Sequence, residues 1–84
     1  MDNIDKIELI AFRAILSATG RIKYNLGHGF KLDIEQAIKG KEVEVKQALT
    51  EENVSITLEI ENAIVKTVEK QIREAIRKAK EGKL

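Results

Sequence analysis

Alternation of apolar and polar residues is the strongest pattern in this chain, and it is clearest from Arg21 to Glu35. Even positions there are apolar or His28, and odd positions are charged, amidic or glycine. Successive side chains of a strand point to opposite faces, so the pattern predicts a strand from Arg21 to about Ala37. Within it, Gly27-His28-Gly29 is either a bend or bulge in one long strand or a hairpin turn.

Two later segments repeat the alternation, Glu42 to Leu49 and Val54 to Glu61. The apolar positions of the first segment are Val43, Val45 and Leu49. Lys39-Gly40 and residues 50–53 are rich in turn-forming residues, which favours short connections between strands. The alternation therefore predicts an antiparallel meander of three or four strands.

The segment from Asn3 to Thr19 instead repeats its apolar residues at the period of an α-helix. Asp2, Asn3 or Asp5 is suited to cap its start. Gly20 lies where a left-handed residue commonly ends a helix. A first helix is therefore predicted before the strands.

This predicted helix has two apolar stripes when its residues are placed 100° apart. The wider stripe consists of Ile4, Ile7, Ile10, Ala11, Ala14, Ile15 and Ala18. The second stripe consists of Leu9, Phe12 and Leu16. A helix that is apolar nearly all round is buried on more than one side, and a chain this short has little material for the second side. Leu9, Phe12 and Leu16 are therefore predicted to contact another copy of the chain.

The last segment, from Asn62 or Ala63 to Glu81, is predicted to be an amphipathic helix that Gly82 ends. Its apolar arc consists of Ile64, Val65, Val68, Ile72, Ala75, Ile76 and Ala79. The predicted fold is a two-layer α+β domain, with an N-terminal helix, a three- to four-stranded antiparallel meander and a C-terminal amphipathic helix. Residues 1–84 are predicted to form this one domain.

Composition limits the chemistry open to the chain. There is no Cys, so the sequence has neither disulfides nor thiolate metal sites. No apolar run reaches the roughly 20 residues that span a membrane, and the acidic start does not resemble a secretory signal. These features predict a soluble, intracellular chain with a cytoplasmic location. The net charge is +1, but residues 62–84 hold seven Lys/Arg against three Asp/Glu.

A row of basic residues follows helical spacing along the last segment. It consists of Lys66, Lys70, Arg73, Arg77 and Lys80, and we call it the basic ridge. Cations at helical pitch could track the phosphates of a nucleic acid or an anionic surface. The same pattern is typical of a solvated helix face supported by Glu–Arg and Glu–Lys pairs. The segment has no aromatic residue for stacking on bases.

Other polar residues give weaker signals. His28 could ligate a metal or transfer protons, but it is the chain's single His, and a structural role on the apolar strand face is favoured. Asp33 with Glu35, and Glu42 with Glu44, would each share a strand face, where pairing with nearby lysines is favoured over catalysis. The G-x-G at Gly27 lacks the following helix of a phosphate-binding loop. No catalytic, cofactor-binding or metal-binding residue is predicted, and no cofactor.

Two functional hypotheses remain. The first is a non-enzymatic assembly domain that forms a homo-oligomer through Leu9, Phe12 and Leu16. An exposed sheet edge is a second candidate contact, with another copy of the chain or with another protein. The alternative is a nucleic-acid-binding module that uses the basic ridge without sequence specificity. An enzyme has the least support, because it would need a composite site between subunits.

Overall fold

The computed structural model describes residues 2–28 and 34–82 of the chain. Within these residues the chain forms four α-helices and no strand. The helices are α1 (Asn3–Leu16), α2 (Thr19–Gly27), α3 (Ile34–Glu51) and α4 (Leu58–Lys80). The predicted α+β fold with its antiparallel sheet is therefore wrong, and the described part of the chain is all-helical.

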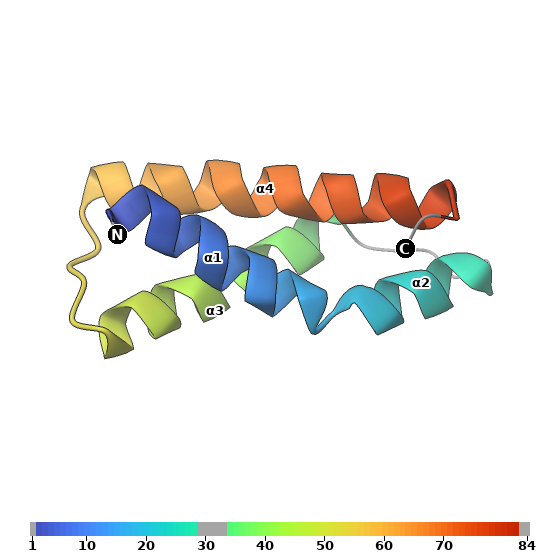
Figure 1. The fold of residues 1–84 in the computed structure, drawn as a ribbon, viewed down its shortest axis with the longest axis horizontal. Helices are drawn as coiled ribbons and strands as arrows, with labels where there is room; N and C mark the ends of the chain where they lie inside the picture. The colour runs from blue at the N-terminus through green and yellow to red at the C-terminus, as the bar shows by residue number, and fades with distance from the viewer. Residues whose placement is uncertain (1, 29–33, 83–84) are drawn as a thin grey trace.

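The longest helix, α4, forms the spine of the molecule, which measures 40 × 22 × 18 Å. Both α1 and α3 pack against α4 and against each other, and α2 packs on α4 (Figure 1). Helices α1 and α4 begin at the same end of the molecule, whereas α3 runs in the opposite direction (Figure 1). One side of α4 is thus covered by three helices, and its other side faces solvent.

Helix α4 begins earlier than predicted, at Leu58. The side chain of Thr57 caps it by accepting a hydrogen bond from the backbone N–H of Ile60 at 3.2 Å. Residues 54–57 are a non-helical lead-in, so the alternation predicted as a third strand covers this lead-in and the first helical turn. Gly82 follows the helix with φ of +71°, which confirms the predicted end.

Helix α3 replaces the strand predicted from Glu42 to Leu49 and the turn predicted at Lys39-Gly40. Its buried residues are Ile38, Val45 and Leu49, which are spaced by seven and four and so lie on one helical face. Val43, expected on the same strand face as Val45, is exposed instead. Glu, Lys, Gln and Ala fill the segment, and these residues favour helices and are depleted in strands. The apolar positions of this segment fit both the two-residue period of a strand and the 3.6-residue period of a helix. The helix preference of the other residues explains why the segment is helical.

The strongest alternating segment is also helical where the structure describes it. Residues 21–27 belong to α2 and residues 34–37 to α3, so a long strand from Arg21 to Ala37 is wrong. Gly27 is the last residue of α2, whereas Gly29, the last residue of the predicted bend or turn, lies outside the described part of the chain. The backbone N–H of His28 donates to the carbonyl of Tyr24 at 3.1 Å, which extends the helical pattern past Gly27.

Helix α1 confirms the predicted first helix, and Asp2, one of the three candidate caps, is its N-cap. Asp2 Oδ1 accepts a hydrogen bond from the backbone N–H of Asp5 at 2.9 Å. The helix ends at Leu16, before the predicted Thr19, and α2 starts at Thr19 after a turn of two residues, Ser17 and Ala18. The Thr19 hydroxyl donates to the Ile15 carbonyl at 3.2 Å within this break. Gly20 lies inside α2 and does not end the first helix.

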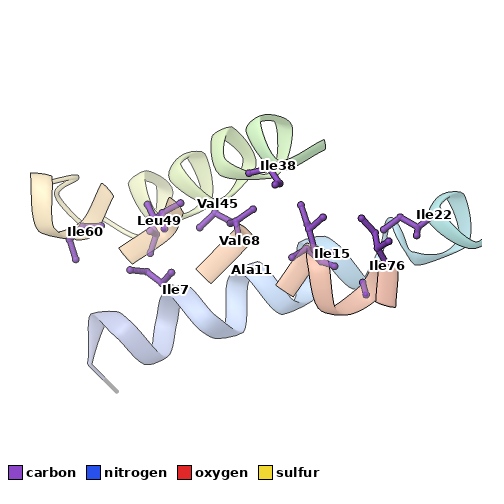
Figure 2. Packing of buried hydrophobic residues seen from close by; sticks show 13 residues of the cluster. Ile7, Ala11, Ile15, Ile22, Ile38, Val45, Leu49, Ile60, Val68 and Ile76 are labelled. Carbon is purple, nitrogen blue, oxygen red and sulfur yellow. The ribbon is translucent and has the colours of Figure 1, made fainter. Parts of the chain in front are cut away.

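All four helices contribute to a single aliphatic core. Its buried members are Ile7, Ala11, Ile15, Ile22, Ile38, Val45, Leu49, Ile60, Ile64, Val68, Ile72, Ala75 and Ile76. Figure 2 shows Val45 and Val68 near the middle of the cluster, with Ile60 toward one end and Ile22 and Ile76 toward the other. No polar or charged residue is buried among the described residues, so apolar burial is the main stabilising term.

Candidate interaction surface

The second stripe of α1, formed by Leu9, Phe12 and Leu16, faces away from the core. These side chains are 37%, 56% and 59% exposed, respectively. On the opposite face of the same helix, Ile7 and Ala11 are fully buried. The helices of this chain therefore complete their core without the second stripe, which we call the α1 stripe from here on.

A hollow of about 350 Å³ adjoins the α1 stripe where α1 meets α4. It is lined by Phe12, Ile15, Leu16, Thr19, Lys70, Gln71, Glu74, Ala75 and Lys78. Phe12 and Leu16 come from the predicted contact residues and Lys70 from the basic ridge. The structure thus brings parts of two separately predicted sites to one place, while Leu9 lies outside the hollow.

The lysines at the rim of this hollow have no ion-pair partner among the described residues. Glu74 lies between Lys70 and Lys78 in the sequence, but its carboxylate pairs with Arg77. This hydrogen-bonded pair holds the pKa of Glu74 below its ordinary value of 4.5. The charges of Lys78 and Lys70 lower this pKa further. The hollow therefore combines apolar lining residues with two lysines that form no direct ion pair.

The five residues of the basic ridge all lie exposed on α4, but their charges are not equally free. Arg73 Nε donates to Glu69 at 3.1 Å, and its guanidinium also lies 3.9 Å from Glu35. Arg77 pairs with Glu74 and, at 2.9 Å, with Glu81. Lys66, Lys70 and Lys80 form no ion pair with the residues that the structure describes. Carboxylates thus offset the two arginines, which carry the best phosphate-binding geometry.

No pattern in the local sequence singles out Gln71. Its Nε2 donates to the backbone carbonyl of Glu8 at 3.3 Å, which links α4 to α1 beside the hollow. Its Oε1 is buried and has no hydrogen-bond partner among the described residues. Only the packing of α1 on α4 reveals this contact, because it joins residues far apart in the sequence.

The remaining predicted residues do not form a chemical site. The ring of His28 stacks on Tyr24 with centroids 4.0 Å apart, and its Nδ1 lies 2.8 Å from the Tyr24 carbonyl oxygen. This contact replaces the predicted place of His28 on an apolar strand face. The imidazole is exposed and lies against Tyr24 in the last turns of α2.

The predicted pairs of carboxylates on shared strand faces are wrong where the structure describes them. Glu35 pairs with Arg73, and Glu44 pairs with Lys41 at 3.0 Å. Glu42 is half-buried on α3, and Asp33 lies outside the described residues. Residues 2–28 and 34–82 contain no group of three or more His, Cys, Asp or Glu that could hold a metal ion.

A second hollow of about 350 Å³ lies where α1, α2, α3 and α4 meet. Its lining includes Ile15, Ile22 and Ile72 with the polar residues Arg21, Asn25 and Lys41. Lys41 is engaged by a carboxylate of its own helix. The hollow has neither a nucleophile nor a carboxylate among its lining residues, so its described walls do not support acid–base chemistry.

No described helix is both long and apolar enough to cross a membrane. Comparisons with protein-family models, with curated proteins and with solved structures found no match to this chain. The arguments for function therefore rest on the surface itself.

Proposed function

We propose that this chain is a non-enzymatic assembly domain that forms a homo-oligomer through the α1 stripe. The observation that supports this function is the exposure of Leu9, Phe12 and Leu16 on a helix whose opposite face already completes the core. Adjacent exposed apolar residues of this size are a common feature of protein–protein contact surfaces.

Burial of the stripe provides the mechanism. Apolar surface contributes roughly 25 cal/mol per Å² when it is removed from water. A few hundred Å² buried between copies would contribute several kcal/mol before the entropic costs of association. Phe12 is the largest of the three side chains and borders the hollow, so it is the main expected contact.

The other predicted interactions, a sheet-edge contact and nucleic-acid binding, have less support. A sheet edge no longer applies, because the described residues contain no strand. Nucleic-acid binding would rely on a basic ridge in which carboxylates pair with both Arg73 and Arg77. A labelled oligonucleotide titrated across a salt series tests this alternative directly. Strong binding that falls with salt and with reversal of Arg73 and Arg77 would favour it over assembly.

The decisive experiment is absolute mass by light scattering after size exclusion, at low and high salt. We expect a dimer or larger species that persists at high salt, because apolar burial dominates the contact. Phe12→Glu should return the chain to a monomer with its helical circular dichroism retained. Val43→Glu is the matched control, because Val43 is 54% exposed on α3, outside the stripe.

Two outcomes would contradict the proposal. One is a wild-type monomer at micromolar concentration. The other is an unchanged mass for both Leu9→Glu and Phe12→Glu.

A further inference from the structure

The charges around the α1 stripe are arranged unevenly along its length. Asp5 and Glu8 are exposed on α1 at the N-terminal end of the stripe. Lys70, Glu74 and Lys78 lie near its other end, because they line the same hollow as Leu16. Glu74 is paired with Arg77, so the two lysines leave this end with a net positive charge. Asp5, Glu8, Lys70 and Lys78 form no direct ion pair with a described residue, although the two lysines act on Glu74 through their charge. The cap of α1 uses the backbone N–H of Asp5 rather than its carboxylate.

The direction of the helices preserves this separation. Helices α1 and α4 begin at the same end of the molecule, so the later residues of α4 lie beside the later residues of α1 (Figure 1). Asp5 and Leu16 are eleven residues apart, which corresponds to about 16 Å along a helix. The stripe therefore has an acidic end and a basic end.

A two-fold contact uses the same patch on both copies, so the patch must complement itself after rotation. If two stripes met in the same direction, Asp5 would face Asp5 and Lys78 would face Lys78. If they met in opposite directions about an axis near Phe12, Lys78 of one copy would face Asp5 of the other. Leu16 would then lie across from Leu9, which joins the apolar residues along the whole contact.

The shape of the surface agrees with the same arrangement. Phe12 and Leu16 project beside a hollow that they themselves help to line. A projecting side chain next to a recess is the feature that lets a patch interdigitate with its own copy. In the same-direction arrangement each end of the stripe would meet an end of the same charge, and the repulsion between like charges disfavours that pairing.

We infer that the partner of the α1 stripe is a second copy bound in the opposite direction, with the two-fold axis near Phe12 and Lys78 of each copy facing Asp5 of the other. This inference rests on the proposed function, since it requires that the stripe be a contact between copies. It adds the direction and register of that contact and the charges that specify them.

Charge reversal tests the direction. Asp5→Lys or Lys78→Glu should each raise the dimer dissociation constant by about tenfold or more, because each creates like-charge contacts twice per dimer. The double variant Asp5→Lys/Lys78→Glu should return to near the wild-type constant, because it restores opposite charges with exchanged positions. Lys39→Glu is the control: this lysine is exposed on α3 and absent from the hollow, so the constant should stay within about twofold.

Cross-linking tests the register independently, since the chain has no native Cys. We expect a mixture of Asp5→Cys and Lys78→Cys chains to form a disulfide-linked dimer, and either variant alone to form almost none. Cross-linking of Asp5→Cys with itself would indicate the same-direction arrangement and would overturn the inference.

The two proposals fail in different ways. A monomeric wild-type chain would remove both of them. A dimer that Phe12→Glu dissociates, but in which the double charge variant remains as weak as the single ones, would retain the assembly function and reject the opposed arrangement. Circular dichroism of every variant distinguishes loss of assembly from loss of folding.

Discussion

Helices α1 and α4 contribute to the same core, but the residues on their outer faces differ in kind. Each buries an aliphatic face, with Ile7 in α1 and Ile64 in α4 both fully inaccessible. The outer face of α4 is charged and crossed by ion pairs such as that between Arg77 and Glu81. The outer face of α1 instead exposes the stripe that includes Phe12.

The difference shows which part of each helix the fold requires. A helix at the surface of a domain needs one apolar face for docking, and its opposite face is free to vary. In α4 that free face is solvated, whereas in α1 it is apolar although nothing in the described chain covers it. The comparison therefore separates residues that stabilise the fold from residues available for a partner.

The largest expected effect comes from truncating the inner faces. Ile7→Ala and Ile64→Ala should each lower the free energy of unfolding by about 2–5 kcal/mol, since each removes fully buried side-chain volume. Urea unfolding at a concentration where the chain is monomeric measures this. Leu9→Ala is the matched change on the outer face of α1 and should cost less than about 1 kcal/mol. An equal loss of unfolding free energy in Leu9→Ala and Ile7→Ala would contradict the distinction between the inner and outer faces of α1.

The next effect concerns the start of α4. Thr57→Ala should lower the free energy of unfolding by about 1 kcal/mol, because it removes the side-chain acceptor of the Ile60 N–H. Thr57→Ser keeps that acceptor and should stay close to wild type in the same urea titration. No loss in Thr57→Ala would mean that α4 does not begin at this cap, and the later start at Asn62 would need to be reconsidered.

A substitution at Gly40 tests whether this position is helical, as in the structure, or part of a turn, as the alternation predicts. An added Cβ would meet no atom within 4 Å, and the residue lies inside α3. Gly40→Ala should therefore raise the free energy of unfolding by about 0.5–1 kcal/mol. A turn with positive φ at this position would give the opposite sign. Thermal unfolding of the two chains is sufficient to decide.

The smallest expected effect lies on the outer face of α4. The hydrogen bond from Arg77 lowers the pKa of Glu74, so the pair stabilises the folded chain above the ordinary carboxyl pKa. That contribution is lost as the pH falls through the lowered pKa. NMR titration of the Glu74 carboxyl should show the low midpoint, and Arg77→Gln should return it toward the ordinary value. An unchanged midpoint would show that the pair does not persist in solution.

Much of the helical structure at the two ends could be predicted from local sequence. Asp2 is a good N-cap, the apolar residues of α1 follow a 3.6-residue period, and Gly82 is placed to end α4. Each of these signals acts within one or two turns of helix, so no distant contact is needed to interpret it. The start of α4 was missed because Val54, Ile56, Leu58 and Ile60 alternate, while the cap depends on the single hydroxyl of Thr57.

The middle of the chain was predicted wrongly because its apolar residues satisfy two periods. Val45 and Leu49 fit both an alternating strand and a helix repeat of four. The many Glu, Lys and Gln residues between them, and the absence of Pro, were a signal for a continuous helix that alternation outweighed. Val43 shows the distinction most directly: a strand would bury it beside Val45, and the helix exposes it.

For the candidate surface, the residue pattern alone predicts that α1 has two apolar stripes and that the later residues of α4 are rich in cations. Both follow from the identity and spacing of neighbouring residues on one helix. The packing of the helices is needed to show which stripe of α1 is buried and that Phe12 and Lys78 border one hollow. It also shows that carboxylates pair with Arg73 and Arg77. These features arise where residues distant in sequence pack together, and contacts of that kind leave no local pattern in the chain.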